Sequence, residues 1–148
     1  MSGSATAPIL TLEAVNALVP RLRSMMEAQM ERRSEIERRL EQLAALIGQV
    51  PEAIQIDDRD SAPLRELKRD LLERVARYQS AWGEFEDIGA VLKDARRGLV
   101  DFYGHVDGRL VWLCWKFGED AIAHYHGLDE GFSRRRPIEA PMRQRHLN

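Results

Sequence analysis

The sequence predicts an α+β fold in which a long antiparallel helical hairpin is followed by a three-stranded antiparallel β-meander. Two long segments before Gly98 repeat apolar residues at every third or fourth position, as one face of a helix does. After Gly98 the repeat shortens to every second residue, which is typical of half-buried strands. The dipeptide Asp107-Gly108, a strong signal for a two-residue hairpin turn, lies within this second region.

The first helix is predicted from Thr11 to about Gly48. Thr11 can cap its N-terminus, and apolar residues follow at helical spacing. Pro20 cannot donate a hydrogen bond to the carbonyl of Asn16, so a kink or a restart is expected there. A loop from Gly48 to Asp60 leads to the second helix.

The second helix is predicted from Ser61-Ala62-Pro63, a capping serine with a proline in the first turn, to near Gly98. Gly83 and Gly89 inside it are interpreted as points of close packing. Its apolar positions are Leu64, Leu67, Leu71, Val75, Tyr78, Trp82, Phe85, Ile88 and Leu92. Because the loop before it is short compared with the helices, the two helices should run antiparallel.

The meander is predicted to contain strands over 99–106, 109–116 and 121–126. With two-residue turns at both connections, Phe102 pairs with Leu113, and Leu113 pairs with His124. One face then carries Val100, Phe102, Val111, Leu113, Trp115, Ile122, His124 and His126. The other face carries Asp101, Tyr103, His105, Leu110, Trp112, Cys114, Ala123 and Tyr125. The first face should pack on the hairpin, although a slip of one residue would exchange the faces.

The composition indicates one soluble globular domain. The chain has 148 residues, a formal net charge of −2 and 44% hydrophobic residues, which is enough for a single modest core. No apolar run approaches the roughly 20 residues needed to cross a bilayer, and no secretory signal is visible. Cys114 is the single cysteine. A lone cysteine fits a reducing compartment, so we expect a cytoplasmic protein.

The organisation expected is a single domain over 1–148 with four parts. These are a flexible N-terminus (1–10), the helical hairpin (11–97), the meander with a following turn (98–132) and a basic tail (133–148). The tail contains five arginines and one glutamate. Such a tail could make loose phosphate contacts, but the negative total charge argues against a dedicated nucleic-acid interface.

Motifs near both ends of the chain form a pattern. The front carries Thr11-Leu12-Glu13-Ala14 with Asn16, Leu18 and Pro20. The back carries Lys93-Asp94, Gly98-Leu99-Val100-Asp101-Phe102, Asp107-Gly108-Arg109, Leu113-Cys114-Trp115, Gly118-Glu119, His126, Leu128-Asp129, Gly131-Phe132, Arg135 and Pro137. On these residues nearly the whole chain resembles a bacterial family catalogued only as a domain of unknown function, number two-two-zero-three. The resemblance implies no established activity, and the family pattern has no fixed histidine at the position of His124.

His124 and His126 are the residues most like a metal site. Alternate residues of a strand point to the same side, so both imidazoles could reach one zinc, iron or nickel ion. A third ligand could come from Asp129 or from a carboxylate of the hairpin. The alternative is a pair of hydrogen-bonded histidines at the edge of the core. The absence of a fixed third ligand favours this alternative.

A small anion or carboxylate pocket is a second candidate site. Arg109 and Arg135 would bind the anion, and His126 would act as acid or base near neutral pH. Glu119 and Asp129 complete this set of candidate ligand-binding residues. The alternative, a structural turn in which Asp129 caps a helical turn or pairs with an arginine, is favoured.

Cys114 could act as a nucleophile only with a base nearby and a positive environment. In the predicted register Asp101 lies opposite Cys114, and this negative charge would disfavour the thiolate. The sequence therefore predicts a buried, inert cysteine.

The function that these observations favour is a cytoplasmic interaction or scaffold domain, and the sequence shows no catalytic motif that would make it an enzyme. Apolar stripes about 40–50 Å long cannot be covered by a sheet about 20 Å long, so part of them near the hairpin tip should be exposed. Dimerisation as a four-helix bundle or coiled coil would cover them, so we expect a homodimer. The alternatives are that the two helices cover each other, and that the chain is a small metal-binding protein or metal-dependent enzyme. No membrane or nucleic-acid partner is expected, and any other protein partner is not identified.

Overall fold

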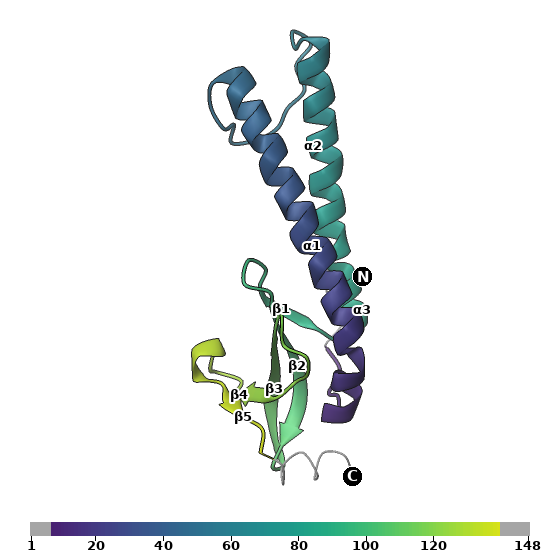
Figure 1. Ribbon diagram of the computed structural model, residues 1–148, viewed down its shortest axis with the longest axis vertical. Helices are drawn as coiled ribbons and strands as arrows, with labels where there is room; N and C mark the ends of the chain where they lie inside the picture. The colour runs from purple at the N-terminus through teal and green to yellow at the C-terminus, as the bar shows by residue number, and fades with distance from the viewer. Residues whose placement is uncertain (1–6, 140–148) are drawn as a thin grey trace. The chain divides into compact units, whose positions relative to one another are not determined.

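The computed structural model of the chain describes residues 7–139 and has an α+β fold, as predicted. The helices are α1 (Leu12–Ile47), α2 (Ala62–Ala81) and α3 (Gly83–Asp87) (Figure 1). An antiparallel sheet follows, with strands in the order β1 (Val91–Asp94), β2 (Leu99–Val106), β3 (Arg109–Lys116), β4 (His124–His126) and β5 (Arg136–Pro137). A short 3₁₀ helix, Phe132–Arg134, lies between β4 and β5. The sheet therefore has five strands where three were predicted.

The chain divides into two compact units. The sheet unit comprises 1–26 and 83–148, of which 7–26 and 83–139 are described, and the hairpin unit comprises 27–82. The helix α1 contributes to both units, because its first turns belong to the sheet unit and the rest to the hairpin unit. None of the helices in the described part of the chain is long and apolar enough to span a membrane.

The helix α1 is continuous from residue 12 to 47, so of the kink or restart expected at Pro20, the restart does not occur. Thr11 caps it as predicted, since its Oγ1 accepts a hydrogen bond from the amide of Ala14 at 3.0 Å. The proline removes one helical hydrogen bond, but Val19 and Leu22 on either side of it are fully buried. We attribute the continuity of the helix to this packing.

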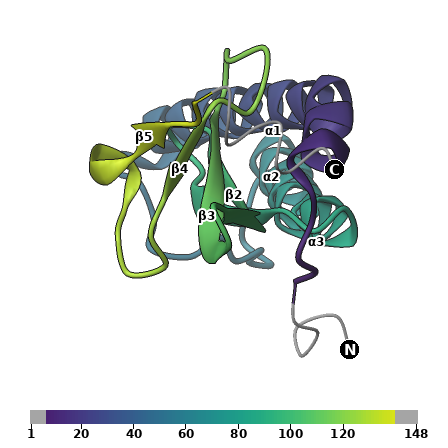
Figure 2. The same cartoon turned by 90° about the horizontal axis from the view of Figure 1, so that it is seen from below.

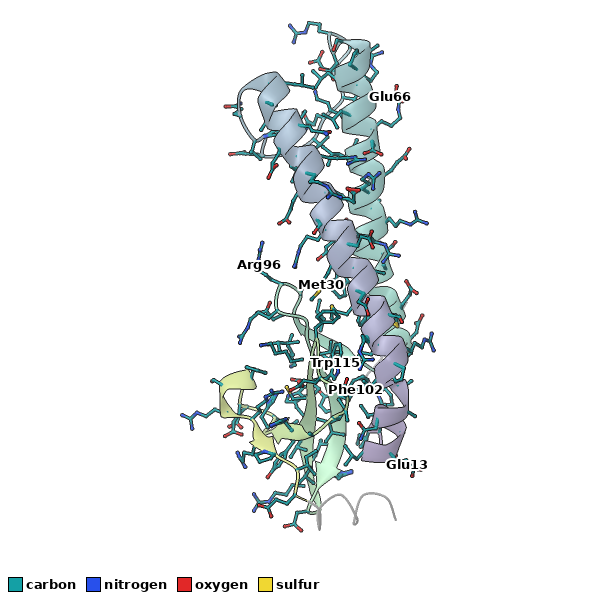
Figure 3. The ribbon with its side chains drawn as sticks, in the orientation of Figure 1. Glu13, Met30, Glu66, Arg96, Phe102 and Trp115 are labelled. Carbon is teal, nitrogen blue, oxygen red and sulfur yellow. The ribbon has the colours of Figure 1, made fainter. Side chains whose placement is uncertain are left out.

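The core of the sheet unit lies between the first turns of α1 and one face of β2 and β3. Phe102 and Trp115 on that face are 0% exposed, and Figure 3 shows both on the side of the sheet that faces these turns. The buried residues of α1 in this unit are Leu12, Val15, Val19, Leu22 and Met26. The register of β2 with β3 pairs Phe102 with Leu113, as predicted. This part of the apolar face is therefore confirmed.

The register of β4 differs from the prediction by one residue. His124 pairs with Cys114, and His126 pairs with Trp112, whereas Leu113 was the expected partner of His124. Both histidines therefore lie on the same face as Asp101 and Cys114, and not on the apolar face. Figure 2 shows β4 beside β3, with β5 next to it.

A connection longer than two residues causes this shift. The strand β4 begins only at His124, so residues 117–123 join it to β3. Two anchors hold the connection: the amide of Ile122 donates to Asn16 Oδ1 at 2.6 Å, and Glu119 Oε1 accepts from the amide of Lys116 at 2.8 Å. The prediction assumed the shortest possible turn, and that assumption was wrong.

The helical segment ends at Asp87, ten residues before the predicted end at 97. Gly89 adopts a positive φ of 86°, and the amide of Ala90 donates to the carbonyl of Phe85 at 2.9 Å. This arrangement is a Schellman-type helix end, in which glycine is the favoured residue. Leu92, which continued the apolar spacing, belongs instead to β1. Gly89 thus terminates the helix and is also closely packed, since an added Cβ would lie 2.9 Å from Pro8 Cγ. At Gly83 an added Cβ would meet no atom within 4 Å, so the close packing expected there is absent.

The core of the hairpin unit lies between α1 and α2. It contains the buried Ile36, Leu43 and Leu71, with partly buried hydrophobic residues packed against them: Leu40, Ile54, Leu64, Leu67, Val75 and Tyr78. The two helices therefore cover most of each other's apolar stripes. The α2 helix begins at its predicted cap, Ser61, whose side chain accepts from the amide of Leu64.

Both ends of the described chain are tied to the sheet. Ile9 forms a parallel bridge with Tyr103, although a flexible segment was predicted over 1–10. In the predicted tail, the amide of Ile138 donates to the carbonyl of Ala123 at 2.8 Å. The predictions of a flexible N-terminus and a basic tail also cover 1–6 and 140–148, which lie outside the described residues.

Candidate functional site

Three neighbouring strands bring together a buried cluster of Asp101, Cys114 and His126. Asp101 of β2 pairs directly with Cys114 of β3, and His126 of β4 pairs with the residue two positions before Cys114. All three side chains therefore lie on one face of the sheet, and the residues are 1%, 1% and 2% exposed. One ligand atom of each lies within 4.8 Å of the others. Within residues 7–139 these are the only three His, Cys, Asp or Glu side chains grouped this closely.

The imidazole of His126 faces a hydrogen-bond acceptor at each nitrogen. Its Nδ1 lies 3.0 Å from the carbonyl oxygen of Gly127, and its Nε2 lies 2.9 Å from Asp101 Oδ2. A neutral imidazole carries only one N–H. A second proton is therefore shared between His126 and Asp101, on the imidazole or on the carboxyl. Burial raises the pKa of Asp101 above its ordinary value, although the neighbouring His126 opposes this effect.

Cys114 is a protonated thiol at neutral pH. Burial, together with the carboxylate of Asp101, raises the pKa of Cys114 to about 12. The guanidinium of Arg135, whose Nη1 lies 3.9 Å from Sγ, opposes this rise. The prediction that Cys114 is buried opposite Asp101 is confirmed. A thiol with this pKa is a poor nucleophile.

An ion pair between Arg135 and Glu119 lies beside the cluster. The guanidinium donates from Nη1 to Oε1 at 3.1 Å and from Nη2 to Oε2 at 2.7 Å. Burial alone would raise the pKa of Glu119, but the hydrogen bonds from Arg135 and from the amide of Lys116 outweigh it and lower this pKa. Arg135 also lies 4.3 Å from the centre of the Phe132 ring. It is thus fixed by two neighbours where it contacts Cys114.

The residues proposed as metal ligands from the sequence are not brought together. His124 Nδ1 lies 4.0 Å from Glu119 Oε2, whereas His126 faces Asp101. Asp129 is exposed in the turn after β4. That turn is held by Glu130, whose Oε1 accepts from the amide of Gly127 at 2.8 Å, rather than by Asp129.

The residues proposed for an anion pocket meet only in part. Glu119 and Arg135 are in contact, but they pair with each other. Arg109 is exposed at the start of β3, next to the 107–108 turn, whereas the Glu119 pair lies beyond the end of that strand.

Asp101 and Cys114 were not predicted from the sequence as partners of His126. The wrong register of β4 placed His126 on the opposite face from them. One signal was available, because a buried carboxyl group needs a hydrogen-bond partner. Asp101 stands between Val100 and Phe102, and such a carboxyl should be matched with a polar side chain of a neighbouring strand.

A second feature lies on the hairpin unit. Four large hydrophobic residues at the end of α1 and in the following loop are exposed: Leu46 (61%), Ile47 (37%), Val50 (65%) and Ile56 (43%). We call these four residues the tip patch. Exposed apolar residues that gather in one region are a feature of interaction surfaces.

Comparison with known proteins gives a family but no activity. Neither the curated proteins nor the solved structures contain a match to the chain. A family model described as an uncharacterised conserved protein, DUF2203, matches residues 9–138. This match includes all of the described helices and strands and agrees with the resemblance seen in the motifs. The chain therefore belongs to the uncharacterised conserved family DUF2203.

Proposed function

We propose that the chain is a protein-interaction domain that self-associates through its hairpin unit. The observation that carries this proposal is the exposure of the tip patch. Fully burying a large aliphatic side chain is worth about 1.5–3 kcal/mol, so covering Leu46 and Val50 in a dimer would contribute a substantial free energy.

The surface that supports self-association is smaller than the sequence suggested. The stripes of α1 and α2 are covered mainly by each other, in the cluster around Leu43 and Leu71. What remains exposed is the tip patch, together with Leu72 (41% exposed) on α2. The contact would therefore be made by the end of the hairpin unit and not by a continuous coiled coil.

The charge distribution of the hairpin unit favours a second copy of the chain as the partner. Residues 41–60, which contain the tip patch, have five acidic side chains and one arginine, a net charge of −4. Two basic residues of α2 already contact this segment, since Arg65 donates to the carbonyl of Asp58 and Lys68 pairs with Asp60. Two hairpin units packed antiparallel would place the acidic tip of each against the arginines farther along α1 and α2 of the other.

A groove between α1 and α2 could receive the acidic tip. It has a volume of about 560 Å³ and is lined by Arg32, Asp70, Glu73, Arg74 and Arg77. Its three arginines outnumber its two carboxylates. Acidic side chains near the tip patch, such as Asp58, would complement this lining.

The test is the molecular mass of the full chain, measured by light scattering and sedimentation over a range of concentrations. The wild-type chain is expected to dimerise. The double variant Leu46→Glu/Val50→Glu should weaken dimerisation at least about tenfold, because it places charge in the apolar contact. Leu128→Glu is the matched control, since Leu128 is 48% exposed on the sheet unit and should not affect the mass.

Two results would overturn the proposal. One is a wild-type chain that remains monomeric at the highest concentration tested. The other is a dimer on which the tip variant and the Leu128 control have the same effect. A dimer that weakens as salt increases would agree with the charge argument.

A further inference from the structure

The cluster of Asp101, Cys114 and His126 has the composition of a metal-ligand set. It offers one carboxylate, one sulfur and one imidazole, which is a mixture of borderline and soft donors. Calcium and magnesium prefer oxygen ligands, so this mixture does not suit them. Zinc and cobalt in their divalent forms accept all three donor types.

The orientation of His126 agrees with a role as a ligand. In metal sites, the imidazole nitrogen that does not bind the ion usually donates to a carbonyl or a carboxylate. Here Nδ1 donates to the carbonyl of Gly127 at 3.0 Å, and this hydrogen bond leaves Nε2 facing Asp101 Oδ2 at 2.9 Å. The carbonyl of Gly127 thus holds the imidazole of His126 in an orientation suited to coordination through Nε2.

The distances are close to those of a tetrahedral ion. Bonds of about 2.0–2.3 Å place tetrahedral ligand atoms roughly 3.3–3.6 Å apart. His126 Nε2 and Asp101 Oδ2 are 2.9 Å apart, and all three ligand atoms lie within 4.8 Å of one another. Adjustments of roughly an ångström, within reach of side-chain rotation, would bring them to bonding distance.

We infer that Asp101, Cys114 and His126 bind one divalent transition-metal ion of the zinc type. This inference is independent of the proposed self-association, because it concerns the sheet unit and not the tip patch. It also differs from the ligand set suggested by the sequence, since His126 is its only shared member.

The protons and charges balance when the ion binds. The ion replaces the thiol proton of Cys114 and the proton shared by Asp101 and His126, while the Nδ1–H of His126 remains in place. About two protons are therefore released for each ion bound. The thiolate and the carboxylate then neutralise the two positive charges of the ion, so the buried site gains no net charge. Arg135, which is paired with Glu119, contacts Cys114 Sγ and can donate a hydrogen bond to the bound thiolate.

The first test uses cobalt(II) as a spectroscopic probe of the full chain after treatment with a chelator. Cys114 is the only cysteine in the sequence, so a thiolate-to-cobalt charge-transfer band must come from this residue. We expect one such band that saturates at one ion per chain and is abolished by excess zinc. Because this measurement needs no variant, it remains decisive even where a substitution prevents folding.

The second test measures zinc affinity by titration calorimetry. Cys114→Ser and His126→Gln should each weaken zinc binding at least about a hundredfold. Replacing even a residue that only hydrogen-bonds to a ligand can weaken metal binding 10–100-fold. The matched controls are His124→Gln and Asp129→Asn, which should bind zinc as the wild type does. In weakly buffered solution, the wild type should release about two protons per ion.

A chain without a thiolate-to-cobalt band would overturn the inference. So would zinc binding that His124→Gln weakens as much as His126→Gln does. In either case the Asp101, Cys114 and His126 cluster is a hydrogen-bonded part of the core and not a metal site.

Discussion

Individual polar residues in the sheet unit are stabilised by partners far away in the sequence. Glu119 connects the end of β3 to the segment before β5, since it accepts from the amide of Lys116 and pairs with Arg135. Its side chain is 25% exposed, so its charge is only partly screened by solvent. The free energy that this carboxylate contributes to folding should therefore depend on its ionisation.

We predict that Glu119→Gln lowers the free energy of unfolding by about 1–3 kcal/mol at pH 7. The pKa of Glu119 is lower in the folded chain than its ordinary value of 4.5. The stabilisation that its carboxylate gives the folded chain is therefore fully present above pH 4.5. The contribution is lost as the pH falls below 4.5 and through the folded pKa. Denaturation of both proteins from pH 7 to pH 3 should show the difference between them shrinking at the acid end.

The control for this prediction is Glu66→Gln. Glu66 is exposed on α2 and points away from the helix (Figure 3). Its substitution should change the free energy of unfolding by less than about 0.5 kcal/mol. A cost of Glu119→Gln that stays constant over the whole pH range would contradict the assignment to the ion pair.

At the scale of elements, the sequence predicted most helix starts and the central hairpin, because each depends on local signals. Thr11 and Ser61 cap helices as expected, and Asp107-Gly108 turns β2 into β3. The register of β4 was not predictable in this way. It depends on contacts over long sequence separations, such as that between Asn16 and Ile122. The candidate site was missed for the same reason, since the register decides which residues face Asp101.

The end of the helical segment shows how periodicity can mislead. The spacing from Phe85 through Ile88 to Leu92 fits a helix, yet Leu92 lies in β1. Gly89 was the competing signal, because its backbone has a positive φ of 86° that side chains other than glycine adopt at a cost. A helix C-terminus and close packing are both reasons for a glycine, and both apply at Gly89, whereas the sequence indicated only the packing.

We predict that Gly89→Ala lowers the free energy of unfolding by about 1–3 kcal/mol. The new Cβ would lie 2.9 Å from Pro8 Cγ and 3.3 Å from Leu10 Cδ1, in addition to the strain from the positive φ. Chemical denaturation measures this effect. Gly83→Ala is the matched control, because no atom lies within 4 Å of its new Cβ, and it should be neutral or stabilising by up to about 1 kcal/mol.

If Gly89→Ala and Gly83→Ala lowered the free energy of unfolding equally, the effect would be a general one of removing glycine. The conformation of Gly89 would then not be what ends the helix.

At the scale of the whole molecule, each unit has its own core. The hairpin unit is built around Ile36, Leu43 and Leu71, whereas the sheet unit is built around residues such as Phe102 and Trp115. A loss of packing in one core should therefore affect mainly the amides of that unit.

We predict that Leu71→Ala increases hydrogen exchange over 27–82 and leaves the amides of β2 and β3 nearly unchanged. Leu71 is fully buried, and such a truncation costs about 2–5 kcal/mol. Hydrogen exchange followed by mass spectrometry resolves the two units. Leu113→Ala, at a residue 1% exposed in the sheet unit, should produce the opposite pattern. An equal increase in both units for either variant would mean that the two cores unfold as one cooperative unit.

The single buried thiol makes the opening of the sheet unit measurable by chemical modification. In the metal-free chain Cys114 is 1% exposed, and its pKa of about 12 keeps it almost unreactive while the strands remain paired. An alkylating reagent can modify it only when β2, β3 and β4 separate. The rate of alkylation therefore reports how often the sheet opens, without any engineered label.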